Sequence, residues 1–263
     1  MTVSEALRLA ERELAAAGVD TPRVDAELLL AHVLGTSRSG VYARADAEVP
    51  GTWHALLGRR AQREPLAYVL GEWGFRRLTL KTDPRALVPR PETETLVERA
   101  LALIDDLDQP RVLDVGVGSG AIALAIKDEA PRARVTGVDT SSRALGLARE
   151  NAATLGLDVE LRLGGVDAAA DGWDLVVANP PYVTRDALPT LQPELRWEPN
   201  EALVGNGFHR EIARVAATRT IAFEVADGEA RSVAASLADL GYDGIAITRD
   251  LSGTERIVEG RSR

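Results

Sequence analysis

Apolar residues recur at helical spacing through the first part of the chain, and polar caps separate the apolar runs. Thr2 and Glu5 have the spacing of a capping box ahead of Leu7, Ala10 and Leu14. These residues predict an amphipathic helix at the start of the chain.

Two further helices are predicted in the same region. Thr21 and Pro22 have the character of an N-cap and a first helical residue, and the apolar run over residues 24–34 stops at Gly35. A third helix is expected over residues 53–63. Residues 1–72 are therefore predicted to form a small helical bundle.

The pattern changes after Gly71, where glycine, aromatic and alternating apolar residues predict extended chain. Residues 75–82 are interpreted as extended, as half of a hairpin within an inter-domain linker over residues 73–86. A helix is expected to follow from about Thr93 to Leu107.

Short apolar or β-rich runs then alternate with helical stretches. The runs lie at residues 112–115, 134–138, 174–177 and 221–224. This alternation is typical of a parallel sheet with crossover helices. It predicts an α/β domain over residues 87–263.

Composition narrows the class of protein. Of the 263 residues, 45% are hydrophobic, yet no apolar run is long enough to cross a bilayer. The N-terminal stretch carries acidic residues and no extended apolar segment, so it resembles neither a signal nor a transit peptide. We expect a soluble cytoplasmic monomer.

Cysteine, histidine and charge exclude several chemistries. There is no cysteine, which removes disulfides, zinc ribbons and thiol nucleophiles. His32, His54 and His209 lie far apart without ligand spacing, so no metal site is expected. The formal net charge of −9 argues against a broad duplex-binding face, because lysine and arginine are what neutralise phosphates. A local basic patch or a basic protein partner stays compatible with that charge.

A glycine-rich loop lies where a buried strand is expected to turn into a helix. In the segment VLDVGVGSGAIALAI the glycines are Gly116, Gly118 and Gly120. Glycine lets the backbone approach a ligand there, and the helix N-terminus offers N–H groups. Val117 stands where related enzymes often carry a small hydroxyl residue. Because backbone N–H groups make most of the contacts in such a loop, we expect this substitution to cost little ligand affinity. The loop alone does not identify a ligand, because similar turns occur in dinucleotide-binding folds and some only pack.

Asp139 ends the next strand about twenty residues beyond the loop, where a carboxylate can accept both hydroxyls of a ribose. A nicotinamide cofactor passes that test as well. The GxGxG spacing after Asp114, however, resembles motif I of methyltransferases rather than GxGxxG. The alternative is that Asp139 is a helix N-cap ahead of Ser141, and one residue can serve both purposes.

The segment Asn179-Pro180-Pro181-Tyr182 directly follows a predicted strand, so it lies at the carboxyl edge of the sheet, where ligands of open α/β sheets bind. An amide nitrogen is a poor nucleophile because its lone pair is delocalised into the carbonyl. The Asn179 side-chain oxygen and the Pro180 carbonyl can each accept one N–H of such a group, since proline leaves nearby carbonyls unpaired.

Tyr182 can cover the flat face of the same planar group. Methyl transfer from a sulfonium disperses charge, so it needs alignment and exclusion of water more than a general base. The segment therefore indicates methyl transfer to a planar nitrogen. The alternative interpretation is a proline-rich turn without chemistry.

The chain resembles the HemK/PrmC family of release factor glutamine methyltransferases across nearly its whole length. Two segments look like the inter-domain region of that family, REPLAYVLGEWGF at 63–75 and DPRALVPRPETE at 83–94. DVGVGSGAIALA, NPPY and PELRWEPNEAL at 193–203 follow in the expected order. Motif I and NPPY are shared by many methyltransferases, whereas the other three segments are far more specific.

The resemblance implies a Rossmann-like methyltransferase domain that uses S-adenosylmethionine, preceded by the helical bundle, which would recognise the substrate. It implies methylation of the glutamine side-chain amide in the Gly-Gly-Gln motif of class 1 release factors, the expected partners. The implied cofactor-binding residues are Gly116, Val117, Gly118, Ser119, Gly120, Asp139 and Asn179. The implied substrate-binding residues are Asn179, Pro180, Pro181 and Tyr182, of which Asn179, Pro180 and Tyr182 are the expected catalytic residues.

Two segments depart from the family pattern. Gly164-Gly165-Val166-Asp167 replaces the usual Gly-Asp beside the adenine, so Asp167 is expected to act from a shifted position. The stretch leading to Ile221 is several residues short and lacks a Pro-Gly-Gly turn, so altered late strands or a less stable cofactor domain are expected.

Two other functions remain open from the sequence. The first is an adenine-N6 methyltransferase, because the exocyclic amine of adenine is also a planar NH2 group that NPPY could hold. Such an enzyme needs a flipped or single-stranded base and usually a basic cleft. A catalytically silent binding module of the same fold is the second alternative, because fold does not establish function.

Overall fold

The computed structural model of the protein describes residues 1–262. The chain divides into two compact units. The helical unit comprises Met1–Glu72 and Leu191–Trp197, and the sheet unit comprises Trp73–Thr190 and the chain from Glu198 onward. Among the described residues, no helix is long and apolar enough to span a membrane.

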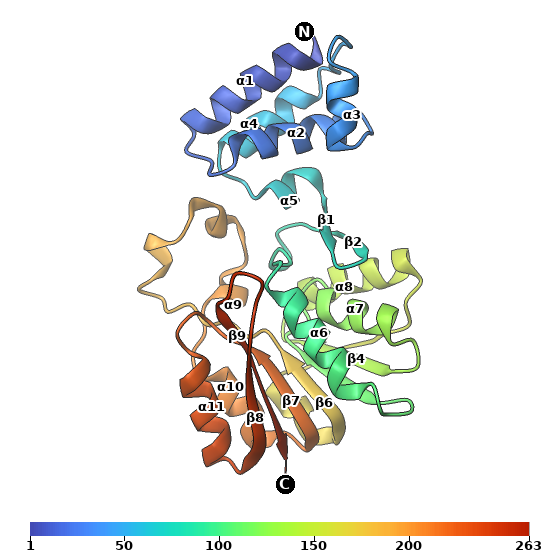
Figure 1. Ribbon diagram of the computed structural model, residues 1–263, viewed down its shortest axis with the longest axis vertical. Helices are drawn as coiled ribbons and strands as arrows, with labels where there is room; N and C mark the ends of the chain where they lie inside the picture. The colour runs from blue at the N-terminus through green and yellow to red at the C-terminus, as the bar shows by residue number, and fades with distance from the viewer. Residues whose placement is uncertain (263) are drawn as a thin grey trace. The chain divides into compact units, whose positions relative to one another are not determined.

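Five helices build the helical unit, as the sequence predicts for a small bundle (Figure 1). They are α1 (Val3–Ala16), α2 (Pro22–Val33), α3 (Arg38–Ala43), α4 (Trp53–Ala61) and α5 (Leu66–Leu70). The capping box is confirmed, because the Thr2 N–H donates to Glu5 Oε2 at 2.8 Å and the Glu5 N–H donates to Thr2 Oγ1 at 3.3 Å. Helix α4 ends two residues earlier than predicted, since Arg63 adopts a left-handed φ of +66°.

The segment Leu191–Trp197 belongs to the helical unit although it lies far along the chain. Glu194 accepts hydrogen bonds from Arg63 Nε at 2.6 Å and Nη2 at 2.7 Å, and it forms an ion pair with Arg60 at 2.8 Å. Arg60 is buried and also donates to Asp25 at 2.7 Å. Nothing in the hydrophobic pattern predicts this association.

A seven-stranded sheet forms the centre of the sheet unit, in the order β5-β4-β3-β6-β7-β9-β8. Strands β3 to β7 are mutually parallel, whereas β9 runs antiparallel to β7 and to β8. The strands are β3 (Arg111–Val115), β4 (Arg134–Asp139), β5 (Glu160–Leu163), β6 (Trp173–Ala178), β7 (Thr218–Glu224), β8 (Tyr242–Arg249) and β9 (Glu255–Ser262). The predicted α/β class is confirmed.

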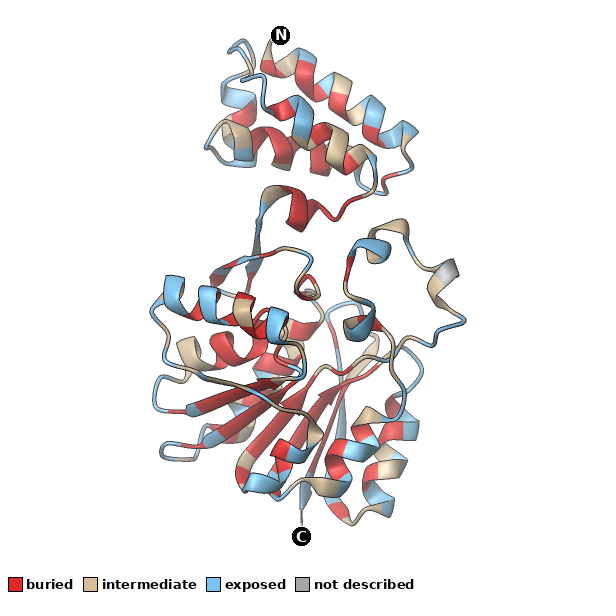
Figure 2. Cartoon of the chain, turned by 180° about the vertical axis from the view of Figure 1, so that it is seen from behind, coloured by how far each residue is buried: buried red, intermediate tan, exposed pale blue. Residues whose placement is uncertain are grey.

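Helices cover both faces of the sheet, and its middle strands are almost wholly buried (Figure 2). One face packs against α6, α7 and α8, and the other against α10 and α11. The helices of this unit are α6 (Thr93–Ile104), α7 (Ala121–Glu129), α8 (Ser142–Leu155), α9 (Asn200–Leu203), α10 (Phe208–Val215) and α11 (Ala230–Asp239). Helix α6 ends at Ile104 rather than Leu107. Burial on both faces explains why the parallel strands are continuous apolar runs in the sequence.

The predicted hairpin is present, but its bounds differ from the prediction. Residues 75–82 are not one extended segment, because β1 (Glu72–Phe75) and β2 (Leu78–Lys81) are the two arms of a hairpin. Arg76 lies in the turn with a φ of +50°. The short stretch before Ile221 leads into β7, which pairs with both β6 and β9. Altered late strands, or a less stable domain, stay a prediction.

Candidate active site

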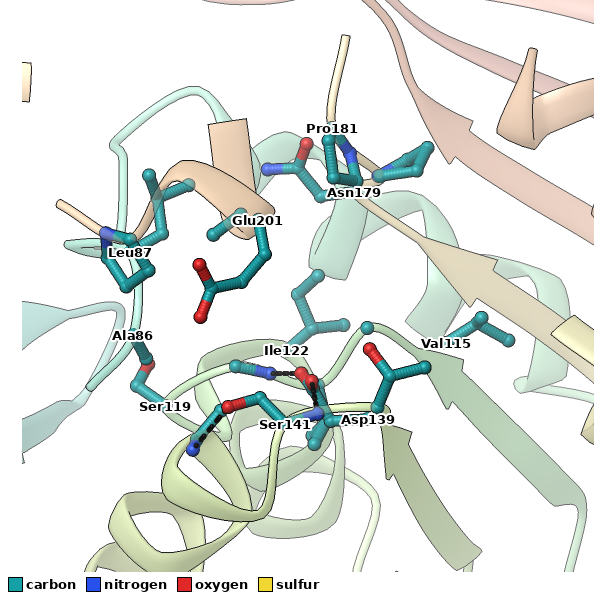
Figure 3. Close-up of a pocket in the computed structure, with 18 of the residues that line it drawn as sticks. Ala86, Leu87, Val115, Ser119, Ile122, Asp139, Ser141, Asn179, Pro181 and Glu201 are labelled. Carbon is teal, nitrogen blue, oxygen red and sulfur yellow. Dashed lines mark hydrogen bonds between the residues drawn. The ribbon is translucent and has the colours of Figure 1, made fainter. Parts of the chain in front are cut away.

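A cavity in the sheet unit opens at the carboxyl ends of β3, β4 and β6. This is the edge at which open α/β sheets bind ligands. Figure 3 shows Asp139 and Ser141 on one side of the cavity and Asn179 and Pro181 on the opposite side. The structure therefore brings all of the predicted cofactor residues except Gly120, and all of the NPPY segment except Tyr182, around a single space.

The glycine loop needs its glycines for conformation. Gly116, Gly118 and Gly120 have φ values of +80°, +55° and +91°, which side chains rarely tolerate. The N–H groups of Gly116 and Val117 both donate to the Val138 carbonyl, at 2.8 and 2.9 Å. These two N–H groups hold the loop against β4, so they are not the ones that meet a ligand.

Val117 points into the protein and is accommodated by a glycine on the neighbouring strand. Val117 is buried, and a Cβ placed on Gly137 would lie 2.6 Å from its Cγ2 atom. The side chain thus packs where β4 has none. This arrangement gives a physical reason why a branched residue fits a position at which a small one is usual.

Asp139 connects the glycine loop to the start of α8. Its Oδ2 accepts the Gly118 N–H at 2.9 Å and its Oδ1 accepts the Ser141 N–H at 2.8 Å, both drawn in Figure 3. The N-cap of α8 is Ser141, whose hydroxyl accepts the Ala144 N–H at 3.3 Å, so the N-cap interpretation of Asp139 is wrong. A carboxylate has about four acceptor positions, and two are still available to hydroxyl donors.

Asp114 lies beneath the loop and is fully buried. Its Oδ2 accepts the Ala123 N–H at 3.1 Å, whereas Oδ1 has no partner among the described residues. Burial raises the pKa of Asp114 to about 7, and the nearby charge of Asp139 adds to that rise. Burial therefore favours the neutral form of this carboxyl beside the glycine loop.

Asn179 extends from the end of β6 to the rim of the cavity. Its Nδ2 donates to Thr93 Oγ1 at 3.2 Å. Behind it the NPPY turn packs tightly, since a Cβ on Gly205 would lie 2.7 Å from the Pro181 carbonyl oxygen. Tyr182 does not line this cavity and is 36% exposed, so its role over the substrate stays a prediction.

A buried glutamate joins two of the segments that carry the family resemblance. Glu198, from PELRWEPNEAL, accepts the Val88 N–H at 3.0 Å and a hydrogen bond from Arg90 in DPRALVPRPETE. Burial raises the pKa of Glu198, and the charge of Arg90 opposes that rise. Residues 85–90 line the cavity, which places this segment at the site. The sequence pattern contains no signal for this pairing.

Two further acidic residues, one lining the cavity and one at the end of the neighbouring strand β7, were not predicted from the sequence. The side chain of Glu201 on α9 points into the cavity (Figure 3). Glu224 ends β7, is 2% exposed, and has an Oε2 atom without a partner in the described part of the chain. An acidic residue at the end of a predicted strand was the only available signal for Glu224, and helical spacing gave none for Glu201.

Gly164, Gly165 and Val166, which follow β5, also line the cavity. Asp167 Oδ1 accepts the Gly165 N–H at 3.3 Å, so its carboxylate shapes this turn. A direct contact between Asp167 and the adenine stays a prediction.

Two protein families match the sequence. The PrmC N-terminal domain matches residues 5–71, and the methyltransferase small domain matches residues 93–239. The hMettl16 catalytic domain, solved with a MAT2A 3′UTR hairpin, superposes with a TM-score of 0.58 at 13% identity, covering 79% of this chain and 82% of that one. At that identity the likeness shows the fold alone.

Curated relatives match over almost the full chain. A release factor glutamine methyltransferase of Deinococcus radiodurans is 41% identical, covering 99% of both chains. Those of Caulobacter vibrioides and Vibrio cholerae are 37% and 38% identical, covering 99% of this chain and 96% and 97% of their own. This chain belongs to the family of S-adenosylmethionine-dependent release factor glutamine methyltransferases.

Proposed function

We propose that the protein methylates the side-chain amide nitrogen of the glutamine in the Gly-Gly-Gln motif of class 1 release factors. The observation that carries this proposal is the position of Asn179, on the rim of the cavity that also holds Asp139 and the glycine loop. An acceptor for an amide N–H and a site for a nucleoside thus share one space.

The donor set of the cavity fits S-adenosylmethionine. The Asp139 carboxylate has acceptor positions left for two ribose hydroxyls, and the glycine loop approaches without side chains. Gly164 to Val166 line the same cavity and would contact the base. The cofactor supplies an electrophilic methyl group on a sulfonium.

The protein must hold the substrate amide so that its nitrogen lone pair faces the methyl carbon. Asn179 Oδ1 would accept one amide N–H and the Pro180 carbonyl the other. Within residues 1–262, no backbone N–H donates to that carbonyl. Two fixed acceptors orient a planar group without needing a general base, and alignment then supplies much of the rate.

The other functions considered from the sequence are not favoured. The relatives that match across the whole chain are named release factor glutamine methyltransferases. The net charge of −9 also gives no support for binding of a nucleic-acid substrate.

The test is incubation with labelled S-adenosylmethionine and, separately, release factor, free nucleic acid or neither. Mass spectrometry of the modified peptide identifies the acceptor atom. Asn179→Ala should lower turnover by about a hundredfold to a thousandfold, on the order of 3 to 4 kcal/mol. Asn179→Asp keeps the acceptor and should retain more activity than the alanine variant. Wild-type turnover by both variants would show that NPPY is not the site.

We further propose that the helical unit selects the release factor, in the cytoplasm, while the sheet unit binds the cofactor. Every residue that lines the cavity lies in the sheet unit. A chain beginning near Leu78 should therefore bind S-adenosylmethionine yet methylate release factor poorly. Full turnover by that chain would contradict the division of roles.

A further inference from the structure

The side chains of Asn179, Thr93 and Glu224 form a line of interacting groups next to the NPPY segment. Ala178 pairs with Phe223 in the parallel ladder of β6 and β7, so the residues that follow, Asn179 and Glu224, are neighbours at the carboxyl edge. Thr93 is the first residue of α6 and is buried. It is the middle member of the line. Asn179 Nδ2 donates to Thr93 Oγ1 at 3.2 Å, and the Thr93 hydroxyl is near enough to the Glu224 carboxyl to lower the pKa of that group.

The protonation state of Glu224 decides which groups of this line donate hydrogen bonds and which accept them. An ionised carboxylate can only accept, so Thr93 must give its one proton to Glu224. The Thr93 oxygen is then left as an acceptor, and only the NH2 group of Asn179 can face it. The Asn179 oxygen consequently points away from Thr93. Glu224 does not line the cofactor cavity, so its effect on the reaction passes through the other two residues.

We propose that Glu224 and Thr93 are positioning residues that hold the Asn179 amide with its oxygen toward the substrate glutamine. The inference rests on the proposed function, because it assigns the aimed oxygen to the substrate amide. Without the line, rotation of the Asn179 amide by 180° would present a donor to a substrate that also donates. The substrate amide would then lose an acceptor and its alignment.

Protonation of Glu224 exchanges the donors and acceptors along this line. Burial is the largest effect on this carboxyl and raises its pKa to about 7. The charges of Arg256 and Arg90 and the hydrogen bond from Thr93 oppose the rise, and Glu92 adds to it. A protonated Glu224 donates to the Thr93 oxygen, which turns the Thr93 proton toward Asn179 and favours the rotated amide. Turnover should therefore rise with pH as Glu224 ionises.

Two other titratable groups lie near Glu224, and neither is expected to cause the rise of turnover with pH. The pKa of Tyr182 is raised above its ordinary value, so the phenol stays neutral. His209 Nε2 lies 2.8 Å from the Glu224 backbone oxygen and therefore donates to it. Burial lowers the pKa of His209 from its ordinary value, which moves its titration away from that of Glu224.

The experiment compares the full-length wild-type protein with Thr93→Val, Thr93→Ser and Glu224→Gln. Turnover and KM for release factor are measured from pH 5.5 to 9, and cofactor Kd is measured by calorimetry. Thr93→Val should lower kcat by about tenfold to a hundredfold, with cofactor Kd little changed, because misalignment alone costs rate. Thr93→Ser restores the hydroxyl and should recover most of that loss. Glu224→Gln should remove the acidic limb of the pH profile.

The outcomes separate this inference from the proposed function. A wild-type acidic limb that persists in Glu224→Gln, or a Thr93→Val variant as active as Thr93→Ser, overturns the positioning role while methylation of release factor stands. A folded Thr93→Val that binds cofactor much more weakly than Thr93→Ser also overturns it, because Thr93 would then act on the cofactor. Wild-type protein that modifies no release factor at any pH contradicts the proposed function itself.

Discussion

Replacing Asp139 by alanine removes one carboxylate that serves two purposes. In the protein alone, it accepts the N–H groups of Gly118 and Ser141 at 2.9 and 2.8 Å. Its remaining acceptor positions are those we assign to two ribose hydroxyls. Hydrogen bonds to a charged group contribute about 1.5 to 3 kcal/mol. The Kd for S-adenosylmethionine should therefore rise by roughly ten- to a hundred-and-fifty-fold.

The assay is calorimetry with S-adenosylhomocysteine and with its 2′-deoxy analogue. Wild-type protein should prefer the ribose form, and Asp139→Ala should bind both equally weakly. The two orphaned N–H groups should also lower the free energy of unfolding by about 1 kcal/mol or more.

The matched control is Ser141→Ala. It removes the side-chain cap of α8, an effect of about 0.5 to 2 kcal/mol on stability, and leaves the Asp139 carboxylate in place. If Ser141→Ala weakens binding as much as Asp139→Ala, the loop geometry matters rather than the carboxylate. Unchanged affinity in Asp139→Ala would refute the ribose assignment.

Three other variants test the site. Gly205→Ala places a methyl group 2.6 Å from Phe208 and 2.7 Å from the Pro181 oxygen, so the NPPY turn must shift and turnover should fall by about tenfold or more while cofactor Kd holds. Asp114→Asn removes a carboxyl whose pKa in the folded protein is raised to about 7, so wild-type stability is lost progressively as pH rises from the ordinary aspartate pKa, about 4, to about 7. In chemical denaturation the stability gain of the variant over wild type should therefore grow by roughly 2 to 3 kcal/mol between pH 5 and pH 8, and an equal difference at both pH values would contradict this. Glu201→Gln should weaken binding of cationic S-adenosylmethionine by up to about fivefold and of neutral-sulfur S-adenosylhomocysteine less, as expected for a solvent-exposed charge; equal losses would point to packing.

The elements that periodicity defines were predictable. The apolar runs of β3, β4, β6 and β7 and the capping box of α1 depend on local residue order, and the structure confirms them. Strands β5, β8 and β9 were not predicted. β5 and β8 are the edge strands, and most of their residues are exposed or half-buried, so no continuous apolar run marks them. β9 lies between β7 and β8, but its buried stretch includes Glu259 and so does not read as an apolar run.

The residues of the candidate site show the same difference between local and long-range signals. Asp139 and the glycine loop could be predicted because their spacing reflects a single strand, turn and helix. Glu198 and Glu224 could not, since each lies near a segment more than a hundred residues away, Glu198 near Val88 and Glu224 near Thr93. Such partners are fixed by the order of strands in the sheet, which residue spacing does not reveal.

The membership of Leu191–Trp197 in the helical unit bears on how this protein can change over generations. A recombination event that replaced the first 72 residues would bring in a new bundle but leave the old segment, including Glu194, encoded far downstream. Unless the incoming bundle carried basic residues equivalent to Arg60 and Arg63, Glu194 would lose both of its ion-pair partners. The segment leads directly into Glu198, which anchors the cavity. The two stretches are therefore expected to be inherited together, and compensating substitutions should link Arg60 or Arg63 with Glu194.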